Sequence, residues 1–95
     1  ESGSSTATPL SNSVAIGYRA KNSASNQVVL GNTSTTDNIV YGKLSVSGNR
    51  VNVSTANTPA SASAAGTTGD ICWDANFIYV CVATNTWKRT AIATW

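Results

Sequence analysis

The chain has 95 residues, a length that suits one small domain or one segment of a larger protein. Six basic and four acidic residues give it a net charge of +2, and it contains neither His nor Met. It has no heptads of the coiled-coil kind and no run of about 20 apolar residues, which excludes a helical bundle and membrane insertion. Its basic residues do not cluster, so we expect no nucleic-acid partner.

The composition favours β-structure that depends on outside help for its stability. Val and Ile outnumber Leu, and Ser, Thr, Asn and Gly fill the positions between them. A chain of this size buries a modest share of its surface, and the many Ala and Ser reduce the bulk further. A disulfide, a metal or a partner chain would supply the missing stability. We expect association with other copies to be the main source.

Cysteine and metal chemistry are the weaker options. Without His, and with only two Cys, the chain cannot build the usual structural zinc site, so we predict no metal and no cofactor. Cys72 and Cys81 are nine residues apart and pair only if the strand register places them opposite each other. The alternative, which we favour, is two small apolar side chains within strands.

Residues 1–12 contain one large apolar side chain and are expected to form a flexible leader. The next feature is a repeat, because the block SVAIG at 13–17 returns as QVVLG at 27–31, an offset of 14 residues. The aligned pairs are Val14 with Val28, Ile16 with Leu30, and Gly17 with Gly31. Such a period predicts stacked β-coils that share an apolar seam, although two coils are too few for an independent solenoid.

The middle of the chain alternates and then loses its bulk. We expect a short strand over 39–43 and a β-hairpin over 44–53, where apolar residues alternate on either side of Gly48-Asn49. Residues 54–69 carry no large side chain. This stretch is either a mobile linker or an extended segment laid against a partner, because small residues permit close backbone approach.

The last segment, residues 70–95, predicts a three-stranded antiparallel meander with strands over 70–74, 77–83 and 87–95. The sequence FIYVCVA of the middle strand has bulk on both faces, which is typical of a central strand that is covered on both sides. On the third strand, Trp87 and Arg89 share one face while Lys88 lies on the other.

Catalytic patterns are absent from the sequence. A conventional Ser-His-Asp triad needs His, and neither a G-x-S-x-G elbow nor a phosphate-binding loop is present. Asp70 and Asp74 are four residues apart and leave open a hydrolytic site with paired carboxylates. Because Asp74 precedes Ala75-Asn76, a turn is the simpler explanation, and we predict that the chain is not an enzyme.

The aromatic residues of the last segment suit either a sugar-binding platform or a packed core and intersubunit contact. We favour the second for Trp73 and Tyr79, and we interpret Trp95 as an anchor of the last strand. Trp87 is more open, because Lys88 and Arg89 adjoin it and a guanidinium can stack on an indole. The candidate receptor-binding residues are Trp87, Lys88, Arg89, Arg19 and Lys21.

The repeat blocks, with Ala20 and Ala24 between them, resemble the head repeats of trimeric autotransporter adhesins. The continuation over 26–48 looks more like bacteriophage tail-fibre proteins, and residues 58–95 are similar to a C-terminal module of phage tail-fibre and minor structural proteins. The string YVCVATNTWKR at 79–89 is the most specific part. The resemblance covers about residues 13–95.

The resemblance implies an all-β, homotrimeric, non-enzymatic fibre that lies in the virion tail and recognises a host glycan or outer-membrane protein. Its sections would be a head-repeat β-roll or β-helix at 13–43, a hairpin and linker at 44–69, and a tip at 70–95. We expect three identical weak sites at the fibre end to bind the host receptor together, with avidity. The expected core and trimer-interface residues are Val14, Ile16, Val28, Leu30, Trp73, Ile78, Val80, Trp87 and Trp95.

Two alternatives stay open. In the first, the chain is a structural trimerisation and capping module without its own receptor site. In the second, it is a fragment of a bacterial trimeric adhesin. The presence of only two head repeats, with no membrane-anchor domain after them, argues against the adhesin.

Overall fold

The computed structural model describes residues 3–4 and 10–95, and this part of the chain is all-β, as the composition predicts. Seven short strands fall into two compact units, residues 1–45 and residues 46–95. No helix in the described part of the chain is long and apolar enough to cross a membrane. Each unit is described by itself below.

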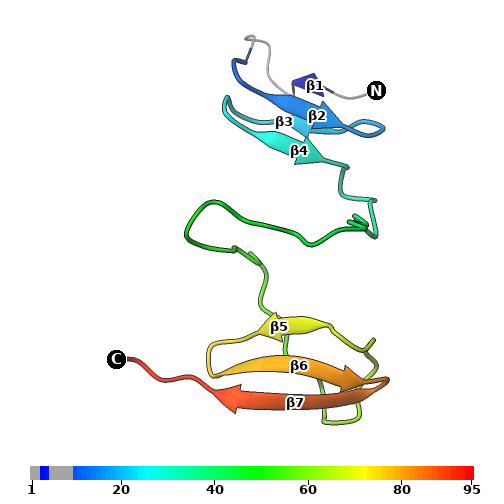
Figure 1. The fold of residues 1–95 in the computed structure, drawn as a ribbon, viewed down its shortest axis with the longest axis vertical. Helices are drawn as coiled ribbons and strands as arrows, with labels where there is room; N and C mark the ends of the chain where they lie inside the picture. The colour runs from blue at the N-terminus through cyan, green and yellow to red at the C-terminus, as the bar shows by residue number, and fades with distance from the viewer. Residues whose placement is uncertain (1–2, 5–9) are drawn as a thin grey trace. The chain divides into compact units, whose positions relative to one another are not determined.

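The first unit is a parallel β-coil with a 14-residue repeat. Its strands are β1 (Gly3–Ser4), β2 (Val14–Ile16), β3 (Lys21–Asn22) and β4 (Val28–Leu30). Strand β2 pairs in parallel with β4, and β1 pairs in parallel with β3 (Figure 1). Val14 lies opposite Val28 and Ile16 opposite Leu30, so the sequence offset is the strand register itself.

The turns of the coil also repeat. Gly17 and Gly31 adopt φ values of 115° and 83°, a region that side chains resist. Asn12 and Asn26 adopt φ values of 51° and 65°, and the Asn12 side-chain amide donates to the Asn26 side-chain oxygen at 3.0 Å. Asn tolerates this left-handed conformation better than most residues, so equivalent positions turn the chain in the same way.

The leader expected over residues 1–12 is only partly testable, since residues 1–2 and 5–9 lie outside the described part. Ser11 and Asn12, however, belong to the first coil: the Ser11 carbonyl accepts a hydrogen bond from the Asn26 amide at 3.0 Å. The dipeptide Ser-Asn recurs at 25–26. The repeat therefore starts two residues earlier than the apolar blocks indicate.

The coil has a small interior in which polar groups take part. Ala20 is fully buried and Asn22 is nearly so. The Asn22 side-chain amide donates to the carbonyl oxygens of Val14 and Gln27, each at 3.1 Å, and so ties β3 to the other side of the coil. The residues of the predicted seam lie on the outside of the single chain. These four residues, all exposed, are Val14, Ile16, Val28 and Leu30.

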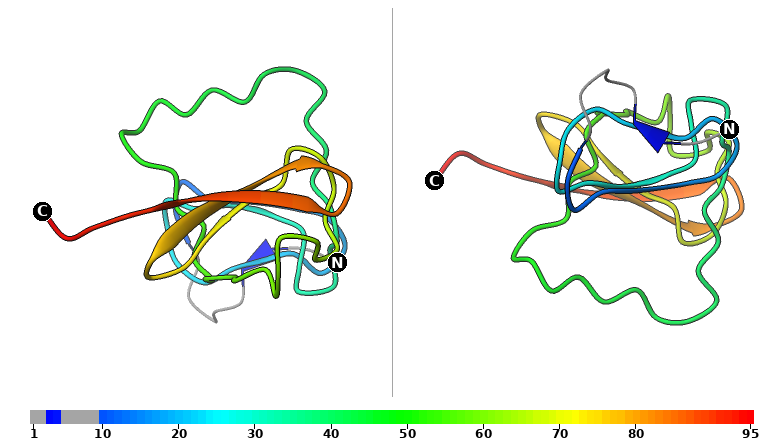
Figure 2. Two further views of the ribbon diagram at one scale, coloured as in Figure 1. Left: turned by 90° about the horizontal axis from the view of Figure 1, so that it is seen from below. Right: turned by 90° about the horizontal axis from the view of Figure 1, so that it is seen from above.

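The predictions for residues 39–53 are wrong for the single chain. The structure has no strand at 39–43 and no hairpin at 44–53, and Figure 2 draws this stretch as a plain tube in both views. Neither Gly48 nor Asn49 adopts the positive φ of a two-residue hairpin turn. Alternation alone cannot hold a hairpin in water, because its apolar face needs a covering surface, and Leu44 and Val51 are exposed.

The second unit contains the predicted antiparallel meander. Its strands are β5 (Ile71–Trp73), β6 (Phe77–Ala83) and β7 (Thr86–Ala91), with β6 in the centre (Figure 1). Strand β7 ends four residues before the predicted bound. Beyond it, Ile92 donates its backbone N–H to the carbonyl of Asn76 at 2.9 Å, and pairing with β6 stops because β6 begins at Phe77.

The two faces of this sheet differ. On the inner face Tyr79 is 4% exposed and Cys81 is fully buried, and Trp87 beside them is half-buried. On the outer face Ile78 and Val80 are 40% and 36% exposed. The expectation that β6 is covered on both faces is therefore wrong for one chain, because the segment that packs on the sheet lies on the inner face.

The covering segment belongs to residues 54–69, the stretch without large side chains. The backbone N–H of Trp87 donates to the Ala62 carbonyl at 2.8 Å, and its indole N–H donates to the Ala64 carbonyl at 3.1 Å. Gly66 lies so close that a Cβ there would be 2.7 Å from the indole Cζ2. Neither interpretation of 54–69 holds as stated: the segment turns at 61–64 and 67–70, and it lies against the sheet of its own chain.

Both cysteines are free, and the register explains why. Cys72 lies opposite Tyr79, whereas Cys81 lies opposite Trp87. The two thiols are therefore not cross-strand partners, which agrees with the favoured interpretation of two small apolar side chains.

Candidate functional site

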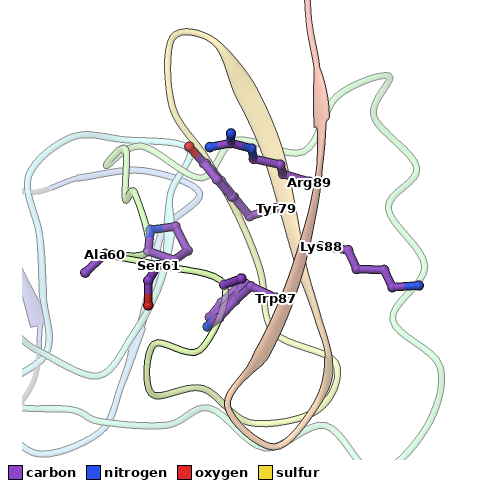
Figure 3. Close-up of a pocket in the computed structure, with 8 residues that line it drawn as sticks. Ala60, Ser61, Tyr79, Trp87, Lys88 and Arg89 are labelled. Atoms are coloured by element: carbon purple, nitrogen blue, oxygen red, sulfur yellow. The ribbon is translucent and has the colours of Figure 1, made fainter.

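A hollow of about 280 Å³ lies where the covering segment meets the sheet (Figure 3). It is lined by residues 59–62 and by Tyr79, Trp87, Lys88 and Arg89. Three of the five predicted receptor-binding residues thus lie at one hollow, and two of them, Trp87 and Arg89, turn their side chains toward it. Figure 3 shows that the Lys88 side chain points away, to the opposite side of β7, as strand alternation requires.

Arg89 is the charged side chain that faces the hollow. It lies opposite Tyr79 in the register, and its guanidinium carbon is 4.0 Å from the centroid of the Phe77 ring. The predicted stacking of Arg89 on Trp87 is not found. The Trp87 indole is fixed beneath the covering segment by its hydrogen bond to Ala64, so Phe77 on the neighbouring strand provides the ring for the cation.

Beside Arg89, Tyr79 connects the hollow to a carboxylate. The Tyr79 hydroxyl donates a short hydrogen bond to Asp74, and its ring packs at 5.8 Å from the Phe77 ring. The hydrogen bond to Asp74 raises the pKa of Tyr79 above its usual value. Tyr79 therefore stays neutral at physiological pH and acts as a rigid wall.

Asp74 is engaged on both of its oxygens. One accepts from Tyr79 and from the Thr58 hydroxyl at 2.7 Å, and the other accepts from the backbone N–H groups of Asn76 and Phe77 at 2.8 and 2.9 Å. These donors, the Tyr79 hydroxyl foremost, hold the pKa of the Asp74 carboxyl well below its usual range. Asp74 is a turn residue, as its position before Ala75-Asn76 predicts. Through Thr58 it also anchors the covering segment.

The hydrogen bonds of Asp74 and Asp70 argue against a hydrolytic site with paired carboxylates. A general acid must hold a proton near neutral pH, which Asp74 does not, because its charged form is the one that the four donors stabilise. Asp70 accepts a hydrogen bond from the Thr67 backbone N–H at 3.0 Å and closes a local turn. The two carboxylates have separate structural partners.

Arg19 and Lys21, the other predicted receptor-binding residues, line a second hollow in the first unit, of about 530 Å³. Its remaining lining comes from residues 29–33. The Arg19 guanidinium carbon lies 5.2 Å from the centroid of the Tyr18 ring. The backbone of Arg19 adopts a φ of 57°. The two groups of candidate residues therefore belong to separate hollows in separate units.

The expected interface residues of the second unit are largely exposed in the single chain. Trp95 is fully exposed, and Trp73 lies on the outer face with Ile78, its register partner. The Trp73 indole N–H donates to the Val53 carbonyl at 2.7 Å. Trp73 is thus no core residue of one chain, because the inner face is filled by Tyr79, Cys81 and Trp87.

Sequence reasoning missed part of the hollow. The rim at 59–62 was assigned to a stretch that was either a linker or a partner-bound segment, and Phe77 was not linked to Arg89. The signal for the rim was the unbroken run of small residues, which permits close approach to a large indole. Within the described part of the chain, no group of three or more His, Cys, Asp or Glu side chains is placed to hold a metal ion.

Comparison with known proteins gives a phage relative. Over 40 residues the chain is 60% identical to a protein of Klebsiella phage K5-2 named "Depolymerase 1, capsule K30/K69-specific". The match covers 42% of this chain and 5% of that protein, so the chain spans a small fraction of its relative's length. No family model matches the chain, and no solved structure does. The similarity supports the phage-related part of the expectation and leaves the head-repeat resemblance without support.

Proposed function

We propose that the chain is a trimeric, non-catalytic section of a phage tail fibre or spike and that it attaches the virion to the host cell surface. The observation that carries this proposal is the 60% identity to the capsule-specific phage depolymerase. A protein so named meets a bacterial polysaccharide, and a section shared with it is a candidate for the same encounter. The phage source of that relative also favours this function over that of a bacterial adhesin fragment.

The exposed apolar side chains support trimerisation. In the first unit, Val28 is 68% exposed and forms a parallel ladder with three other aliphatic residues of β2 and β4. In the second unit, Ile78 and Val80 form the centre of an apolar outer sheet face. Fully burying such a side chain is worth about 1.5–3 kcal/mol, so packing against other copies would supply stability that one chain lacks.

Trimerisation would also shape binding. Three copies of one weak site at the same end of a fibre engage a repetitive polymer together, and the combined affinity exceeds that of one site by orders of magnitude. Arg89 and Trp87 at the hollow of the second unit are the residues that we assign to this contact.

A purely structural role is the second candidate. It is favoured by the amount of apolar surface that the chain exposes in both units, because such surface suits contacts between protein chains more than contacts with a hydrated polymer. In this role the chain aligns and caps the trimer while another section binds the host.

Two measurements on the whole chain separate these functions. Light scattering coupled to size exclusion gives the mass, for which we expect three times the 9.8 kDa of one chain. Binding to immobilised capsular polysaccharide of the K30 and K69 types then tests attachment. A trimer that binds neither polysaccharide nor whole encapsulated cells would support the structural role and contradict attachment.

A charge placed on the outer sheet face tests the trimer. Val80→Asp should reduce the mass to that of one chain and weaken polysaccharide binding by more than about tenfold through lost avidity. Thr84→Asp adds the same charge in the exposed turn between β6 and β7 and should change neither. A wild-type chain with the mass of one copy would overturn the trimer.

A further inference from the structure

The geometry points to a subsite for a carboxylate-bearing sugar, a hexuronic acid unit, in the hollow between residues 59–62 and the inner face of β6 and β7, with Arg89 as its anion-binding side chain. This inference rests on the proposed attachment function and names the sugar class that the site selects.

The size of the hollow suits one sugar unit. At about 280 Å³ it is slightly smaller than the pockets that hold drug-sized ligands. The lining combines aromatic side chains, Tyr79 and Trp87, with a rim of small residues that carries the Ser61 hydroxyl (Figure 3). An apolar wall with a few polar groups is the arrangement that recognises a ring with one apolar face.

The charge of the hollow selects the sugar class. Arg89 is exposed, and no acidic side chain in the described part of the chain forms an ion pair with it. Asp74 and Arg89 both interact with the Tyr79 hydroxyl, and the two Asp74 oxygens accept hydrogen bonds from four donors of the second unit. The Arg89 guanidinium therefore forms no ion pair with an acidic side chain in the described part of the chain, and a ligand carboxylate can supply that partner.

The guanidinium is also held in place before a ligand arrives. It lies 4.0 Å from the Phe77 ring centroid, and Phe77 packs against Tyr79. Tyr79 is fixed in turn by its hydrogen bond to Asp74. An arginine restrained on an aromatic ring presents its planar N–H groups in a fixed fork, which matches the two oxygens of a carboxylate at a low cost in side-chain entropy.

Lys88 provides the matched control. It is the next residue along β7, carries the same charge and is exposed, but its side chain points to the opposite side of the strand (Figure 3). Removing either charge changes the net charge of the chain equally. A site that depends on Arg89 and not on Lys88 is therefore a local site and not a general attraction of a basic protein for an anionic polymer.

The experiment uses the whole chain with methyl β-D-glucuronide and methyl β-D-glucoside. The two differ only at C6, which is a carboxylate in the first and a hydroxymethyl group in the second. In ¹⁵N-labelled protein, titration to 50 mM of the glucuronide should shift the indole N–H of Trp87 and the backbone amides of residues 60–62, while the glucoside shifts them far less. Arg89→Gln should weaken glucuronide binding about tenfold to a hundredfold, as expected for loss of a charged hydrogen-bond partner. Lys88→Gln should bind like the unmodified chain.

Arg89→Lys keeps the charge but loses the planar fork, and an intermediate affinity is expected. Equal binding of the two glycosides, no shift with either at 50 mM, or equal losses in the Arg89 and Lys88 variants would overturn the subsite. These outcomes are separate from failure of attachment: a chain that still binds encapsulated cells without recognising the glucuronide loses the subsite and keeps its function. A chain that binds the glucuronide but no cell or polysaccharide loses the function and keeps the subsite.

Discussion

The coil of the first unit and the sheet of the second are stabilised by different means. In the coil, equivalent residues 14 apart repeat their turns and hydrogen bonds, and the buried residues are the small Ala20 and the polar Asn22. In the sheet, the buried residues are Tyr79 and Cys81, and a segment about 20 residues distant in sequence covers them. Local repetition orders the first unit, and aromatic packing orders the second.

This difference teaches where each unit is vulnerable. A change to one hydrogen-bonded turn should weaken the coil and leave the sheet intact, whereas a change to the aromatic contact should do the reverse. Hydrogen exchange of backbone amides reports the two units separately, because each opens with its own free energy.

The largest effect is expected from Trp87→Ala. It removes the indole that fills the space beneath residues 59–66 and the hydrogen bond to Ala64, so the free energy of unfolding of the second unit should fall by about 3 kcal/mol. Amide exchange should accelerate in β6 and β7 and stay unchanged in β2 and β4. Lys88→Ala is the control. Equal acceleration in both units would contradict the separation.

Gly66→Ala should have the next largest effect. Its Cβ would stand 2.7 Å from the Trp87 ring, so the covering segment must move outward at a cost of about 1–3 kcal/mol. Gly48→Ala is matched to it, because no atom lies within 4 Å of the added Cβ and the residue has no positive φ. Thermal unfolding followed by Trp fluorescence measures both. Similar melting temperatures for the two variants would show that the segment does not lie against the indole.

In the first unit, Asn22→Ala tests the polar interior. It deprives the carbonyls of Val14 and Gln27 of a donor, which should destabilise the coil by about 1–2 kcal/mol. Exchange should accelerate for the amides of β2 and β4 while the sheet amides keep their protection. Asn38→Ala, in the exposed stretch after the coil, serves as the control. An effect confined to the sheet would contradict the assignment.

The smallest effect is a pH dependence confined to the second unit. The folded pKa of Asp74 is lowered, so its contribution to stability is present above the ordinary value of 3.8 and is lost as the pH falls below it. The folded pKa of Tyr79 is raised, so its contribution is present below the ordinary value of 10.0 and is lost as the pH rises above it. Asp74→Asn should flatten both limbs in melting experiments, whereas unchanged limbs would exclude the pair as their cause.

Sequence patterns predicted the elements whose partners are similar or near in sequence. The 14-residue offset gave the exact register of β2 and β4, and turn residues at Asp74–Asn76 and 84–86 gave the meander. The same reasoning failed for 39–53, where the alternation is real but the chain provides no surface to cover it. Within the candidate site, the alternation of side chains along β7 separated Arg89 from Lys88, while the ring on which Arg89 rests was assigned wrongly.

The all-β class, the period of the coil and the faces of the strands follow from residue order alone, because they depend on short-range backbone geometry and on side-chain alternation. The segment that covers Trp87, the ring that holds Arg89 and the apolar residues that one chain leaves exposed became known from the folded chain. Those outcomes depend on close packing between residues that are distant in sequence, where the fit of an indole against a glycine counts for more than any local preference.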